Sequence, residues 1–153
     1  MTTTIRETWQ ARLLVAAQFG LLGAWVLRGP VPASGVLWVG LQVGGALLAA
    51  WSFAEMLLAQ RRMFSISPDP AAHRTLVRSG PYRWIRHPMY AAILLVAVPS
   101  LAGWPGISGL VLVAALAMVL VLKLTLEERL LERRFPDYPA YRRSTWRLCP
   151  FLY

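Results

Sequence analysis

A short polar stretch, Arg86-His87-Pro88-Met89-Tyr90, holds the first set of side chains that could do chemistry. Proline suits the first position of a helix, where its missing N–H costs nothing, so we expect a helix that begins at Pro88 with His87 near its N-cap. The free N–H groups and the dipole of such an end attract anions, and Arg86 adds positive charge. A ligand carboxylate or phosphate would fit there. The alternative is a plain helix cap beside an arginine that binds lipid headgroups, and spacing alone slightly favours it.

Two adjacent carboxylates, Glu127 and Glu128, form the second set. On a helix, Glu127 would pair with Lys123 at i, i+4, an interaction worth about 0.2–0.5 kcal/mol. Glu128 neighbours Glu132, a like-charge spacing that helix stability alone would not select. These carboxylates could instead pair with arginines of the preceding loop, bind a cationic or hydroxyl-bearing ligand, or serve as a general base.

Other reactive side chains carry weaker signals. Glu55 lies inside an apolar run and either pairs with Arg61 or Arg62 or lines a cavity. His73 and His87 have no acidic neighbours at ligand spacing, so we expect no metal site. The sequence also contains neither a Rossmann glycine fingerprint nor a phosphate-binding P-loop.

The composition excludes an ordinary soluble domain. The 153 residues are 57% hydrophobic and 15% charged, with a mean hydropathy of +0.49, whereas soluble proteins are about 45–50% apolar and about 25% charged. The net charge of +9 arises from basic residues between apolar runs, which indicates contact with membrane lipids rather than nucleic acid. The lone Cys149 excludes an intrachain disulfide.

Four apolar runs predict helices within a membrane, namely Leu13–Leu27, Val36–Leu58, Pro88 to about Leu101, and Ile107–Leu126. The first is as short as the core of a signal peptide, and Ala33 offers a weak cleavage site, so a cleaved leader is the alternative for that run. A tight turn separates the last two, and we expect an antiparallel hairpin. Its first helix, about 24 Å long, is too short to cross the hydrocarbon core alone.

The basic residues are strongly sided. With four spans, fifteen of the sixteen Lys and Arg residues fall on one side and only Arg28 falls on the other. The richer side is expected to be cytoplasmic and to hold the N-terminus, the active site and the C-terminus. The sequence thus predicts an all-α integral membrane protein with about four transmembrane helices, the last two forming a hairpin, and a cytoplasmic helical tail. We expect a prokaryotic cytoplasmic membrane.

We expect one membrane domain over residues 1–153, with two spans in 11–58 and the chemical motifs in 59–153. Helix geometry brings those motifs together. With a rise of about 1.5 Å per residue, the fourth helix draws level with Pro88 near Val121, and Glu127 lies about 8 Å further on. Both carboxylates then lie beside the loop 82–87, at the cytoplasmic boundary of the membrane.

The two motifs together resemble a known family. The pattern is Gly80-Pro81-Tyr82-x-x-x-Arg86-His87-Pro88-x-Tyr90, followed after the hairpin by Glu127-Glu128-x-x-Leu131-x-x-x-Phe135 and Tyr138-x-x-Tyr141. It is similar to the isoprenylcysteine carboxyl methyltransferase family and, more broadly, to membrane phospholipid methyltransferases. The resemblance covers about residues 74–148, and the first two apolar runs carry no family signal. Ala92 and Pro136 stand where the family usually has glycine, and Pro136 is expected to end its helix one residue early.

The resemblance implies an integral membrane enzyme that uses S-adenosylmethionine. It implies that His87 and Tyr90 hold the amino-acid end of the cofactor and that Arg86 orients the acceptor. One of Glu127 and Glu128 would contact the cofactor. We assign Glu128 to that contact and Glu127, with Arg86, to catalysis, although the sequence leaves the order of the two glutamates open. The adenosine would be lined by Leu76, Val77, Gly80, Pro81 and Tyr82.

The methyl acceptor is expected to be a hydrophobic small molecule or lipid. A carboxylate acceptor would use Arg86 as a clamp, whereas an amine or thiol would need Glu127 or Glu128 as a base. Two other functions fit the same sequence. One is a membrane protein without catalysis that binds anionic lipid through its basic face. The other is an NADPH-dependent membrane reductase, whose 2′-phosphate would be held by Arg142, Arg143 and Arg147.

Overall fold

The computed structural model describes residues 5–28, 35–64, 76–104 and 106–150. Its helices are α1 (Ile5–Leu27), α2 (Val36–Phe64), α3 (Pro88–Ala97), α4 (Ile107–Arg134) and α5 (Tyr138–Arg143), with 3₁₀ turns η2 (Gly80–Arg83) and η3 (Val98–Ala102). The expectations for Ala33 and His73 fall outside the described residues, as do the side chains of Arg61 and Arg62.

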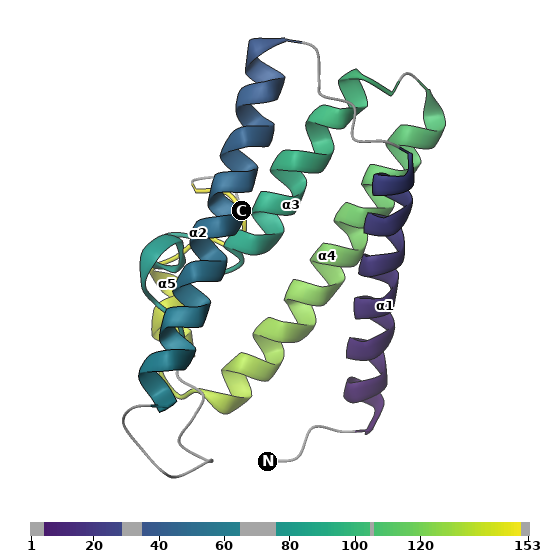
Figure 1. The fold of residues 1–153 in the computed structure, drawn as a ribbon. Coiled ribbons are helices and arrows are strands. Elements are labelled where there is room, and N and C mark those ends of the chain that lie inside the picture. The colour runs from purple at the N-terminus through teal and green to yellow at the C-terminus, as the bar shows by residue number, and fades with distance from the viewer. Residues whose placement is uncertain (1–4, 29–34, 65–75, 105, 151–153) are drawn as a thin grey trace.

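The described helices form a membrane bundle of two antiparallel pairs, α1 with α4 and α2 with α3 (Figure 1). Within the described residues, three segments are long and apolar enough to cross a membrane: Trp9–Leu27, Val36–Ala59 and Ile107–Arg134. A shorter apolar helix covers Pro88–Ala102. The all-α membrane fold predicted from the sequence is therefore confirmed, and so is the reduced length of the third apolar helix.

The long helices extend beyond their apolar runs at one end of the bundle. Helix α1 begins at Ile5 rather than Leu13, α2 continues to Phe64, and α4 continues to Arg134. An apolar run marks the part of a helix that contacts hydrocarbon, whereas backbone hydrogen bonding continues into polar sequence. Helix α4 stops before Pro136, because the residue before a proline disfavours the helical region, and Phe135 is extended (φ −114°, ψ 110°).

The predicted hairpin of α3 and α4 is antiparallel (Figure 1), but each of its helices packs mainly along another helix. Helix α3 packs mainly along α2, and α4 packs mainly along α1. Gly45 explains the first pairing, since a Cβ there would lie 2.9 Å from Leu95 Cβ and from Val96 Cγ2. Small residues allow this close backbone approach between membrane helices. Near Pro99 the backbone of α3 tightens into η3, because proline cannot donate the helical hydrogen bond.

Gly45→Ala should lower the stability of the protein, because the added Cβ meets α3 at less than normal contact distance. Overpacking of this kind costs about 1–3 kcal/mol. Gly44→Ala is the matched control, since nothing lies within 4 Å of a Cβ at Gly44. Thermal unfolding in detergent measures both variants, and an equal loss in the two would contradict the close packing of α2 on α3.

Candidate functional site

A buried carboxylate, Glu128, joins three segments at the end of the bundle where α4 finishes. Its Oε1 lies 2.7 Å from Arg86 Nε, and its Oε2 lies 2.8 Å from Arg147 Nη2. The side chains of Glu128 and Arg86 are only 4% and 7% exposed. An isolated charge is very costly to bury. The buried Glu128 carboxylate therefore needs these two guanidinium groups to compensate its charge. The predicted meeting of the glutamate pair with the 82–87 loop is confirmed.

Backbone hydrogen bonds hold the tail against the same loop. Arg86 N donates to Trp146 O (2.8 Å), His87 N donates to Arg147 O (3.1 Å), and Trp146 N donates to Trp84 O (2.9 Å). Residues 85 and 146 form an isolated parallel β-bridge. The expectation of free N–H groups at the start of α3 is therefore corrected for Arg86 and His87, whose donors are taken by carbonyls of the tail.

The Arg86 side chain donates hydrogen bonds to several of the described protein groups. Its Nη1 donates to the carbonyl oxygens of Arg142 (3.0 Å) and Thr145, in addition to the contact of Nε with Glu128. A planar guanidinium suits such a fixed set of acceptors. The alternative in which Arg86 binds lipid headgroups is wrong, because the side chain is buried and its donors point into the protein.

Glu127 lies one residue away on α4 and has a different environment. Its side chain is 38% exposed, and its Oε1 accepts a hydrogen bond of 2.6 Å from the Tyr90 hydroxyl. The Tyr90 and His87 rings are stacked, with centroids 5.5 Å apart. His87 Nδ1 lies 3.7 Å from Glu127 Oε2. These three side chains form one polar group that is open to a ligand on the Glu127 side.

His87 also carries a buried nitrogen whose hydrogen bonding is incomplete. Its Nε2 makes no hydrogen bond to the described residues, although Glu128 Oε1 lies 3.5 Å away. The Tyr138 hydroxyl is likewise buried without a described hydrogen-bond partner. Buried polar atoms are almost always paired, so an unpaired one at a polar site indicates a place for a ligand or water.

The loop before α3 is anchored to α2 through Glu55. Ser79 Oγ donates to Glu55 Oε2 (2.6 Å), and a Cβ at Gly80 would lie 2.5 Å from Glu55 Cγ. Gly80 also has φ +57°, a conformation that glycine adopts without steric cost. Glu55 therefore holds the loop in place, a role that neither sequence interpretation gave it.

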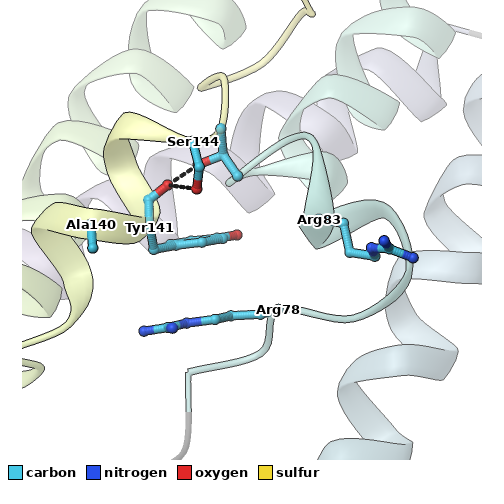
Figure 2. A pocket seen from close by; sticks show the side chains of 6 residues that line it. Arg78, Arg83, Ala140, Tyr141 and Ser144 are labelled. Atoms are coloured by element: carbon cyan, nitrogen blue, oxygen red, sulfur yellow. Dashed lines mark hydrogen bonds between the residues drawn. The ribbon is translucent and has the colours of Figure 1, made fainter.

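A cleft of about 330 Å³ lies between this loop and the tail (Figure 2). Its lining residues are Arg78, Arg83, Ala140, Tyr141, Ser144 and Thr145. The Arg78 guanidinium lies over the Tyr141 ring, with Cζ 5.5 Å from the ring centroid, and also meets Asp137 at 3.5 Å. Because the lining contains two arginines and no carboxylate, the cleft does not suit a cationic ligand.

The buried Tyr141 and the partly buried Tyr82 complete the junction of loop and tail. The Tyr141 hydroxyl donates to Tyr82 O (2.6 Å). Burial raises the pKa of Tyr141 to about 12, and burial together with the charge of Glu127 raises the pKa of Tyr82. Both hydroxyls therefore stay protonated at neutral pH, and Tyr141 keeps its donor role.

Several residues at this site were not singled out as site residues by sequence reasoning. Gln18 on α1 is buried, and Lys123 Nζ donates to its Oε1 (2.8 Å). Polar side chains within apolar runs were the available signal, because membrane helices rarely carry them without a functional or packing reason. Thr145 carried no such signal, since polar residues are ordinary in a tail outside the membrane, and Arg147 was considered only as a phosphate ligand of the reductase alternative.

The fold and the site together define a small integral membrane protein with a cluster of polar side chains at one end of its described helices. Residues 38–133 match the isoprenylcysteine carboxyl methyltransferase (ICMT) family. The chain belongs to this family, whose members are membrane methyltransferases that depend on S-adenosylmethionine. No curated protein and no solved structure matches the chain.

The family match corrects the expected extent of the resemblance. It begins at residue 38, within α2, so the second apolar run does belong to the family region. The contact of Glu55 with Ser79 and Gly80 gives a physical reason, since α2 supports the loop that carries the motif. The match ends at residue 133, before α5, and helix α1 lies outside it.

Arg86→Ala should destabilise the protein by about 3–5 kcal/mol, because it removes one partner of a buried ion pair. Arg142→Ala is the matched control for charge. Its side chain is 45% exposed and lies 3.7 Å from Glu132, so its loss should cost at most about 1 kcal/mol. Thermal unfolding in detergent gives both values, and similar losses would contradict a structural role for the Arg86–Glu128 pair.

Proposed function

We propose that this protein transfers a methyl group from S-adenosylmethionine to a hydrophobic, lipid-like acceptor, and that the site lies where His87, Tyr90 and Glu127 meet. The observation that carries the proposal is the cluster of these three side chains: Tyr90 donates a hydrogen bond to the partly exposed carboxylate of Glu127, and the buried His87 ring stacks on Tyr90 with Nδ1 3.7 Å from Glu127 Oε2. S-Adenosylmethionine, when bound, supplies an electrophilic methyl group on a cationic sulfur.

The chemistry of the donor set fits this cofactor. Glu127 offers a carboxylate to a positively charged group. The residue that donates a hydrogen bond to this carboxylate, Tyr90, is neutral. His87 Nε2 offers a polar atom that the described protein groups leave without a hydrogen bond. A low-dielectric site strengthens such interactions relative to water. These residues would bind and orient the cofactor, and positioning of this kind is the main contribution that methyl transfer needs from a protein.

We propose different roles for the two neighbouring glutamates. Glu127 would face the cofactor, because 38% of its side chain is exposed. Glu128 would be a positioning residue, since its two oxygens already meet Arg86 and Arg147. Arg86 would act with Glu128 to hold the loop and tail together, rather than clamp the acceptor as the resemblance implied.

The adenosine is proposed to lie against the loop between α2 and α3. Its lining would come from Leu76, Val77, Gly80, Pro81 and Tyr82, as the family resemblance implies. Support comes from the anchoring of this loop, through Ser79, by Glu55 on α2. The arginine-lined cleft of Figure 2 is not proposed for the cationic sulfur.

The acceptor is proposed to approach from the membrane and to carry an isoprenylcysteine-like carboxylate, as the family description implies. We propose that the site faces the cytoplasm, because fifteen of sixteen basic residues belong to that side of the sequence. The reductase alternative has less support, because most of its proposed phosphate ligands already contact carboxylates. Arg142 and Arg147, two of the three arginines that it needs, are paired with Glu132 and Glu128.

Glu127→Gln should weaken the binding of S-adenosylmethionine by about tenfold or more, because it removes the charge that faces the cation. Glu132→Gln, an exposed carboxylate on the same helix, is the matched control and should bind normally. Calorimetric titration of the purified protein in detergent measures both. Loss of binding in both variants, or in neither, would overturn the assignment of Glu127.

A panel of acceptors that share one prenyl tail should identify the acceptor group. Transfer of a labelled methyl group to the carboxylic acid is expected, and not to the matching thiol or amine. The product should release labelled methanol in alkali, since a methyl ester hydrolyses there whereas a thioether or methylamine does not. Alkali-stable product would overturn the carboxylate assignment and make Glu127 the candidate base for a thiol or amine.

A further inference from the structure

Lys123 is a partly buried cation that neither the motifs nor the proposed mechanism uses. It lies on α4, one turn before Glu127, and its side chain is only 16% exposed. Its Nζ donates a hydrogen bond of 2.8 Å to Gln18 Oε1, lies 5.1 Å from the centre of the Tyr90 ring, and is 4.0 Å from Glu127 Oε1. The ammonium therefore contacts both α1 and the proposed cofactor site.

Gln18 accepts the hydrogen bond from this ammonium. It belongs to α1 and is 6% exposed, although most of α1 is apolar. An ammonium that leaves water must find acceptors, and two compete for this one: the neutral amide oxygen of Gln18 and the carboxylate of Glu127. The distances of 2.8 Å and 4.0 Å show that Gln18 makes the hydrogen bond, while the carboxylate stays outside hydrogen-bond distance.

This division of partners matters for Glu127. Its Oε1 accepts a hydrogen bond from the neutral Tyr90 hydroxyl instead of a direct bond from Lys123. A lysine in direct contact would neutralise the carboxylate and repel a cationic ligand at the same place. Lys123 and Glu127 already form the i, i+4 ion pair that the sequence predicts, with 4.0 Å between Nζ and Oε1. A competing acceptor is therefore needed to keep this pair from closing to a direct hydrogen bond.

We propose that Gln18 is a positioning residue that holds the Lys123 ammonium away from Glu127 and so keeps this carboxylate available to the cationic cofactor. The inference rests on the proposed function. It gives α1 a role in ligand binding, although α1 lies outside the region of the chain that matches the family. Helix α1 would thereby influence how tightly the cofactor binds, although Gln18 itself would not contact the cofactor.

A double-mutant cycle tests the proposal with Gln18→Leu, Lys123→Met and the two changes combined. The readout is the dissociation constant of S-adenosylmethionine, measured by calorimetric titration in detergent. Gln18→Leu should weaken binding by about tenfold, because Lys123 then turns to Glu127. Lys123→Met should bind at least as tightly as the unaltered protein, since no competing cation remains. The double variant should match Lys123→Met, so that removal of the lysine rescues the loss of the glutamine.

Two further variants separate positioning from packing. Gln18→Glu keeps an oxygen acceptor for the ammonium and should retain tight binding. Gln10→Leu makes the same chemical change at an exposed position of α1 and should leave binding unchanged. Thermal unfolding of each sample shows whether the variants remain folded. If Gln18 serves only to pack α1 against α4, Gln18→Leu would change the unfolding temperature, and Lys123→Met would not restore binding.

The outcomes distinguish the inference from the function on which it rests. If the unaltered protein binds S-adenosylmethionine and the two substitutions act additively, the positioning role of Gln18 is wrong while the cofactor assignment stands. If Gln18→Leu binds S-adenosylmethionine as tightly as the unaltered protein, the positioning role of Gln18 is likewise wrong. If the unaltered, folded protein does not bind S-adenosylmethionine, the proposed function is wrong and the inference falls with it.

Discussion

The burial of one carboxylate, Glu128, is the constraint on which the site depends. A buried charge must be compensated, and this one draws Arg86 from the loop before α3 and Arg147 from the tail after α5. The backbone hydrogen bonds between residues 84–87 and 146–147 follow from that meeting. Segments on both sides of α3 and α4 thus form one unit at the end of the bundle, although they are about sixty residues apart in the chain.

The same constraint gives two adjacent glutamates opposite environments. Successive residues on a helix point about 100° apart, so only one of the pair can face the loop and tail. Glu128 does so and is almost fully enclosed by arginine, whereas Glu127 faces Tyr90 and His87 and remains partly accessible. One carboxylate can therefore stabilise the structure while the other stays available for a ligand.

The bundle brings polar groups together by holding its helices as two pairs. Gly45 allows α2 and α3 to approach closely, and Glu55 on α2 then supports the loop at Ser79 and Gly80. On the other side, α1 packs along α4 and places Gln18 against Lys123. Each pair contributes one partly buried polar contact beside the motif residues, so the helices outside the motifs also shape the site.

The sequence by itself determined the membrane class, the helices and the approximate meeting of the motifs, because apolar run length and helical rise are local properties. It also indicated that α3 is short and that Pro136 ends α4, since both follow from length and from proline geometry. Only the tertiary structure decided which glutamate is buried, that Arg86 binds the protein rather than lipid, and that α3 packs on α2. Those outcomes depend on which side chains meet across distant segments, and residue spacing along the chain does not contain that information.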